Sequence, residues 1–135
     1  MGKINSFEEI TAWQKARQLN VWIYDVTNSN QQFSTDYGLR DHFRRSSISI
    51  SSNIAEGFER ETTKEFIRFL YIAKASEGEF RPKLYLTSDL NYISNEEFKN
   101  ITINIKEISK LISGFIKYLK STLQLSTLKT YEQVY

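Results

Sequence analysis

The chain has 135 residues, of which 40% are apolar and 14% aromatic, enough for one domain with a single hydrophobic core. It contains no cysteine, which excludes disulfides, thiolate metal sites and cysteine nucleophiles. The formal charge of +2 permits nucleic-acid binding but does not argue for it, since dedicated nucleic-acid binders are usually more basic.

The sequence carries no signal for export or for insertion into a membrane. Its first ten residues, MGKINSFEEI, lack the apolar stretch of a signal peptide. No apolar run approaches the roughly 20 residues that are needed to span a bilayer. We therefore expect a cytoplasmic protein without a membrane partner.

Three capping boxes, in which Ser or Thr is followed three residues later by Glu, divide the chain into helices. They are Ser6 with Glu9, Thr62 with Glu65, and Ser94 with Glu97. The first box predicts a helix over residues 7–28. Its apolar face is formed by Ala12, Ala16, Leu19, Ile23 and Val26. Residues 29–36 follow a polar stop and are expected to form a loop.

The stretch SSISISSNIAEGFER, residues 46–60, allows two interpretations. Ile48 and Ile50 alternate with serines, as in a half-buried strand. At helical spacing, however, one face combines Leu39, Phe43, Ser47, Ile50 and Ile54. A lone short strand between long helices would have no partner, so we predict a helix over residues 37–56 that ends at Gly57 as its C′ residue. Small residues would keep this helix slim and let its neighbours approach; they are Ser47, Ser51 and Ser52.

A third helix is predicted to begin near Thr63. Its buried face is formed by Phe66, Phe69, Leu70, Ala73, Phe80 and Leu84. Pro82 lies inside this helix and removes the hydrogen bond to Gly78, at a cost on the order of 3 kcal/mol. We therefore expect a kink, or even a break, between Gly78 and Pro82.

A fourth helix is predicted to begin near Asn95, and its apolar residues alternate at spacings of three and four up to Leu119. The periodicity is lost after Leu123. This predicts a bundle domain over residues 1–123 and a tail over residues 124–135 that is extended, disordered or docked on a neighbour. Four helices joined by short loops predict an all-α, antiparallel, up-down-up-down four-helix bundle.

Residues for catalysis or metal binding do not form a recognisable constellation. His42 is the only histidine and is expected to be an exposed surface residue, and there is neither an H-E-x-x-H motif nor a Gly-rich phosphate loop. Glu56 and Glu79 lie near the predicted core edges, where we expect partly buried carboxylates paired with arginines. The sequence thus predicts a protein that is not an enzyme and needs no cofactor or metal.

Three groups of basic residues are candidates for contacting nucleic acid. They are Arg40, Arg44 and Arg45 in the second helix, Arg60, Lys64 and Arg68 at the start of the third, and Lys106, Lys110 and Lys117 in the fourth. The fourth helix has five lysines between residues 99 and 120 and a single acidic residue, Glu107. Such a stripe can bind phosphates as point charges, although a solvated outer face is the alternative. Exposed tyrosines beside it would favour single-stranded nucleic acid through stacking; the candidates are Tyr37, Tyr71, Tyr85 and Tyr118.

Four runs occur in an order that resembles a known family: AWQKARQL (12–19), SNIAEG (52–57), KEFIRFLYIAK (64–74) and DLNYIS (89–94). The family is that of the bacterial four-helix-bundle 23S rRNA intervening-sequence proteins, related to the accessory variability determinants of diversity-generating retroelements. The resemblance covers residues 6–120. It implies a homopentamer with a role bound to RNA or DNA, and for the accessory determinants a reverse transcriptase partner. The resemblance implies no catalytic residues.

The leading hypothesis is a non-enzymatic oligomeric bundle that binds nucleic acid, RNA above all, through basic surface on the assembled ring. Fivefold repetition of a weakly basic patch would add avidity. The alternative is a protein-interaction scaffold without a nucleic-acid role, and a third hypothesis is an accessory protein of a toxin–antitoxin or phage-defence system. The charge of +2 is lower than that of the accessory determinants and favours a generic family member.

Overall fold

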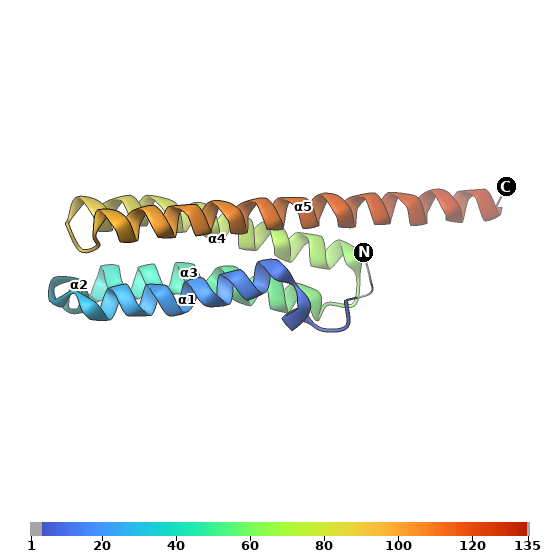
Figure 1. Ribbon diagram of the computed structural model, residues 1–135. Coiled ribbons are helices and arrows are strands. Elements are labelled where there is room, and N and C mark those ends of the chain that lie inside the picture. The colour runs from blue at the N-terminus through green and yellow to red at the C-terminus, as the bar shows by residue number, and fades with distance from the viewer. Residues whose placement is uncertain (1–3, 135) are drawn as a thin grey trace.

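The computed structural model of the protein describes the backbone of residues 4–134 and the side chains of residues 4–125. The long helices are α1 (Thr11–Ser29), α3 (Tyr37–Phe58), α4 (Thr63–Asp89) and α5 (Asn95–Val134), with a 3-10 turn η1 (Phe7–Glu9) and a short helix α2 (Gln31–Thr35). Consecutive long helices run in alternate directions (Figure 1). The predicted all-α four-helix bundle is confirmed.

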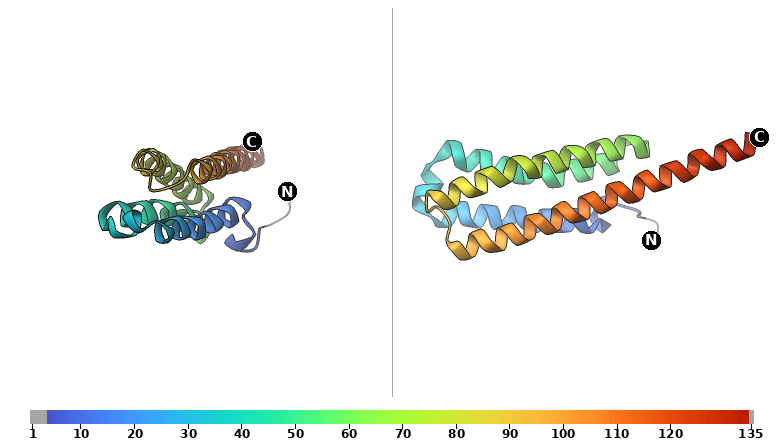
Figure 2. Two further views of the ribbon diagram at one scale, coloured as in Figure 1. Left: turned by 60° about the vertical axis from the view of Figure 1, so that its left-hand side comes forward. Right: turned by 90° about the horizontal axis from the view of Figure 1, so that it is seen from above.

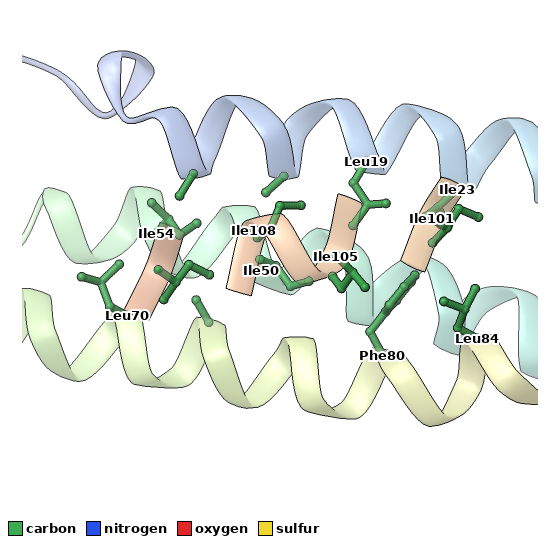
Figure 3. Close-up of a cluster of buried hydrophobic side chains, with 14 of the residues drawn as sticks. Leu19, Ile23, Ile50, Ile54, Leu70, Phe80, Leu84, Ile101, Ile105 and Ile108 are labelled. Atoms are coloured by element: carbon green, nitrogen blue, oxygen red, sulfur yellow. The ribbon is translucent and has the colours of Figure 1, made fainter. Parts of the chain in front are cut away.

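Each long helix packs against two others, so α1, α3, α4 and α5 follow one another around the bundle. Helix α1 contacts α3 and α5, and α4 contacts the same two helices (Figure 2). Ile23, Ile50, Phe80 and Ile105 are fully buried between them (Figure 3). The apolar faces predicted for the first and third helices are buried at every position. None of the helices in the described residues combines the length and apolar character that crossing a membrane requires.

The first helix begins later than predicted. Ile10 has an extended backbone and a buried side chain, and it separates η1 from α1, which starts at Thr11. The carboxylate of Glu9 accepts hydrogen bonds from the backbone N–H of Asn5 at 2.6 Å and of Ser6 at 3.4 Å. The capping motif at Ser6 therefore stabilises the short turn η1 and not the start of α1. The two are separate because the chain leaves helical geometry where Ile10 is buried.

Residues 29–36 are not the predicted loop, because five of them form α2. The Asn30 side chain caps this helix by accepting a hydrogen bond from the N–H of Phe33 at 2.9 Å. The ring of Phe33 is fully buried, with its centroid 5.6 Å from that of Phe43 and 5.0 Å from that of Tyr92. Burial of one aromatic ring thus explains why a polar segment folds into a helix.

Gly57 does not end the second long helix as a C′ residue. Helix α3 continues to Phe58, and the backbone at Gly57 has no positive φ. A Cβ atom added at Gly57 would lie 2.7 Å from the Cβ of Phe69 and 2.9 Å from the Cδ1 of Phe66. The glycine is therefore needed for the close approach of α4, and the helix end needs no left-handed residue.

The serines of α3 hydrogen-bond to both neighbouring helices. Toward α1, Ser47 donates to Oδ1 of Asn20 at 2.7 Å, and Asn20 donates to Oγ of Ser51 at 2.9 Å. Toward α4, Ser49 shares a hydrogen bond of 2.8 Å with Ser76. Ser52, predicted to lie at a packed interface, is exposed instead. Small polar residues thus allow close packing and satisfy one another's hydrogen bonds.

Helix α4 is continuous through Pro82, so the chain does not break there, while a kink between Gly78 and Pro82 stays a prediction. Helix α5 continues to Val134, and the predicted end of regular helix near Leu123 is wrong. The C-terminal part of α5 extends past the ends of the other helices (Figures 1 and 2). The side chains of residues 126–135 lie outside the described ones, and the division into a domain and a tail stays a prediction.

Candidate nucleic-acid interface

Arg44, from the first basic group, holds α3 against the end of α1. Its Nε donates to Oγ1 of Thr27 at 2.9 Å, and its Nη2 donates to Oδ1 of Asn28 at 2.8 Å. The guanidinium also lies 4.3 Å from the ring centroid of Tyr24, a cation–π geometry. All of these contacts are within the bundle, so Arg44 has a structural role.

The other members of the first group do not join it in one surface. Arg40 donates to the carbonyl of Ser34 at 2.9 Å, pairs with Asp41 at 3.0 Å, and lies over the ring of Tyr37 at 4.8 Å. Arg45 is exposed and stands alone, because both neighbours in its group are held by contacts within the chain. The first group therefore does not form a basic patch.

The second group lies around Phe69 at the start of α4. The guanidinium groups of Arg60 and Arg68 lie 4.5 and 4.8 Å from the ring centroid of Phe69. Arg68 also pairs with Glu65 at 2.8 Å, and Lys64 is exposed beside them. Acidic residues near this group in the chain, at positions 59 and 61, are also exposed, so the local charge is mixed.

The third group differs from the other two, because its lysines are open to solvent and lack carboxylate partners. Lys106, Lys110 and Lys117 are all exposed, and their spacings of four and seven residues place them on one side of α5. None of them forms an ion pair within the described residues. Glu107 instead pairs with Lys15 of α1 at 3.0 Å and so lies on another side of α5. The lysine stripe is therefore not neutralised by its one acidic neighbour.

The stripe leads into a hollow between α4 and α5 of about 400 Å³. Lys117 lines it together with Lys120, one of the five lysines noted on this helix, and with Lys74, which the three predicted groups did not include. Lys120 donates to the hydroxyl of Tyr71 at 2.5 Å, so this candidate tyrosine does lie beside basic residues. Lys74 was missed because its relation to the stripe depends on how α4 and α5 pack.

The predictions for other titratable residues are partly wrong. His42 is exposed, as predicted, but so are Glu56 and Glu79, neither of which forms an ion pair within the described residues. The buried carboxylate is that of Glu77, which is 5% exposed and whose Oε1 lies 3.8 Å from Nε of Arg81. Burial raises the pKa of Glu77 despite the opposing charges of Arg81 and Lys74. Its spacing of four from Ala73 and three from Phe80 was the signal for burial.

Metal-binding residues do not gather anywhere in the described part of the chain, where no three His, Asp or Glu side chains are placed to hold an ion. The protein is a four-helix bundle in which, of the three predicted basic groups, only the lysines of α5 are all exposed and without an ion pair within the described residues. It belongs to the family of 23S rRNA-intervening sequence proteins, whose model matches residues 8–114. This confirms the family indicated by the sequence runs.

A solved structure supports the same assignment. It is a protein of unknown function from the S23 ribosomal protein family of Bacteroides thetaiotaomicron, 26% identical in sequence, with a TM-score of 0.71. The match covers 79% of this chain and 99% of that one. A search of curated proteins found no match.

Proposed function

We propose that the protein is a non-enzymatic, oligomeric nucleic-acid-binding protein of the cytoplasm, with RNA as its ligand. The observation that carries the proposal is the exposed lysine stripe of α5, comprising Lys106, Lys110 and Lys117, with Glu107 turned toward Lys15. Lysines without counter-charges can replace the cations condensed on a phosphate backbone. Membership in the 23S rRNA-intervening sequence family is compatible with an RNA ligand.

Oligomerisation is part of the proposal, because three lysines alone give weak binding. Exposed apolar side chains along α4 and at its C-cap offer a surface for a second copy; they are Ile72, Leu86 and the C-cap residue Leu90, between 36% and 45% exposed. Their separations of 14 and 18 residues place them within about 40° on one side of the helix. A homopentamer, as the family resemblance implies, would repeat the lysine stripe five times and multiply its avidity.

The alternative function is a protein-interaction scaffold. The same apolar surface on α4 favours it, because that surface could bind another protein, for example a reverse transcriptase, in place of a second copy. A scaffold and a nucleic-acid binder differ in their dependence on salt, since only phosphate binding releases condensed counterions.

The test measures affinity for labelled single-stranded RNA and duplex DNA at about 50 and about 200 mM salt. In one variant Lys106→Gln, Lys110→Gln and Lys117→Gln are combined. We expect this variant to bind RNA at least about tenfold more weakly at the lower salt, with a shallower dependence on salt. The charge-matched control combines Arg17→Gln, Arg45→Gln and Lys64→Gln on three other helices and is expected to bind RNA like the unaltered protein.

Equal losses in the two triple variants would indicate a general effect of net charge and would contradict the assignment to α5. Affinity without salt dependence, or no affinity for either nucleic acid, would favour the scaffold.

A further inference from the structure

The hollow between α4 and α5 has the lining of an anion-binding site. Its volume of about 400 Å³ falls within the range of small-ligand sites, roughly 300–1000 Å³. The polar groups that face it come from both helices and are those of Tyr71, Lys74, Ser113, Lys117, Lys120, Ser121 and Gln124. No carboxylate is among the described residues that line it.

Three ammonium groups gather in this hollow without a paired anion. Lys74, Lys117 and Lys120 form no ion pair within the described residues. The acidic side chain closest along α4 is Glu77, which is buried, does not line the hollow, and has Arg81 as its ion-pair partner at 3.8 Å. The charge of Lys74 also acts on Glu77, but the two side chains form no ion pair. Like charges repel one another, and this repulsion is relieved when an anion binds between them.

Two hydroxyl groups beside the lysines are available to donate to such an anion. Nζ of Lys74 donates to Oγ of Ser113 at 2.7 Å, and Nζ of Lys120 donates to the hydroxyl of Tyr71 at 2.5 Å. Each hydroxyl oxygen therefore accepts a hydrogen bond from a lysine and keeps its own hydrogen for another acceptor. The lysines in turn are held in place by these bonds and keep further N–H donors.

We propose that this hollow binds the phosphate group of a phosphate-bearing ligand. A phosphate carries up to two negative charges and three acceptor oxygens, which match three ammonium groups and two hydroxyls. Lysine binds phosphate as a point charge, and all three cationic residues that line the hollow are lysines. The inference is independent of the proposed function, because a free phosphate compound and the phosphate of a nucleic acid offer the same chemistry.

The first test titrates the full chain with pyrophosphate and follows backbone amide resonances by NMR. We expect shifts to concentrate at Lys74, Ser113 and Ser121. Combining Lys74→Gln with Lys120→Gln should weaken pyrophosphate binding at least about tenfold, since two of the three ammonium groups are lost. Glutamine at position 74 can still donate to Ser113, so the fold should be retained.

A matched control combines Lys64→Gln with Lys83→Gln. Both lysines lie on α4 outside the hollow, and Lys83 also donates to a serine of a neighbouring helix, Ser46, at 2.8 Å. This variant should bind pyrophosphate like the unaltered protein. Shifts scattered over all surface lysines, or equal losses in the two double variants, would overturn the proposal.

The second test distinguishes the sources of the phosphate, using RNA oligonucleotides with and without a 5′-phosphate. If the unaltered protein prefers the 5′-phosphorylated RNA and the variant altered at Lys74 and Lys120 does not, the group bound in the hollow is a terminal phosphate of RNA. If the variant binds both oligonucleotides more weakly by the same factor, the group bound in the hollow is a phosphate of the RNA backbone. If that variant loses pyrophosphate but binds RNA normally, the hollow serves a free phosphate compound. If pyrophosphate binds in the hollow and RNA binds nowhere, the proposed function fails while this inference stands.

Discussion

Small residues on α3 control how closely its neighbours approach. At Gly57 the missing side chain leaves room for Phe66 and Phe69 of α4, and at Ser47 and Ser51 the hydroxyls meet Asn20 of α1. Dispersion and hydrogen bonds both depend on these short separations, so enlarging one residue should disturb a whole helix pair.

Gly57→Ala should destabilise the protein by about 1–3 kcal/mol, although alanine is normally the better helix former. The added methyl group would lie 2.7 Å from the Cβ of Phe69, an atom that cannot move without its backbone. Gly114→Ala on α5 is the control, since nothing lies within 4 Å of its added Cβ, and it should stabilise by about 0.5–1 kcal/mol. Urea denaturation of both variants measures the difference; a stabilised Gly57→Ala would contradict the close approach.

Glu77 should make stability depend on pH. Burial raises the pKa of Glu77 in the folded state, so folding takes up protons there. Its contribution to the free energy of unfolding is therefore favourable below the ordinary carboxyl pKa and is lost as the pH rises through the raised value. Glu77→Gln removes this pH-dependent contribution to the free energy of unfolding. The variant should therefore be more stable than the unaltered protein at pH 7, by about 1 kcal/mol.

The measurement is urea denaturation of both proteins at pH 4, 5.5 and 7. The difference in the free energy of unfolding between Glu77→Gln and the unaltered protein should shrink steadily toward pH 4. At that pH the carboxyl group of Glu77 is protonated, so the unaltered protein no longer buries a charge there. Arg81, which loses its partner, stays hydrated because its side chain is 45% exposed. A difference that does not change with pH would show that desolvation of Glu77 is unimportant.

At the scale of single helices, α4 contains a residue that disfavours helical structure. Pro82 lies in mid-helix and is exposed, so it removes a hydrogen bond to Gly78 without filling the core. Pro82→Ala should therefore raise the free energy of unfolding, by about 1–3 kcal/mol, measured by urea denaturation. A loss of stability instead would mean that α4 packs through a distortion that depends on the proline.

The helix boundaries show which features can be predicted from the local sequence and which depend on tertiary packing. The capping box of Ser94 and Glu97 forms both reciprocal hydrogen bonds, at 3.0 and 2.8 Å, and α5 begins where predicted. At Phe33 the sequence is polar on both sides, and the helix there depends on a ring packed against residues distant in the chain. Local capping was predictable, whereas burial of a lone aromatic residue was not.

For the whole molecule, the proposal of a ring predicts a particle with five times the monomer mass of 15.9 kDa in light scattering. Leu86→Glu combined with Leu90→Glu should dissociate it, since both side chains are exposed in the monomer and charges there oppose burial. The monomers should remain folded by circular dichroism.

The control for this experiment combines Gln18→Glu and Gln31→Glu, which add the same charge on exposed positions of α1 and α2. It should keep the assembled mass. A monomeric unaltered protein would refute the ring, and an intact assembly of the leucine variant would place the contact elsewhere.

The fold class and the buried faces could be predicted from the sequence, because a 3.6-residue period of apolar side chains leaves few ways to exclude water. The sequence also located the lysine stripe, since residues four and seven apart on one helix share a side whatever the rest of the chain does. The ion pair of Glu107 with Lys15, and the approach of Lys74 on α4 to Lys117 and Lys120 on α5, depend on how the helices pack and could not be predicted. Those residues are more than 40 positions apart, and only the antiparallel packing of two helices brings their charges into one hollow.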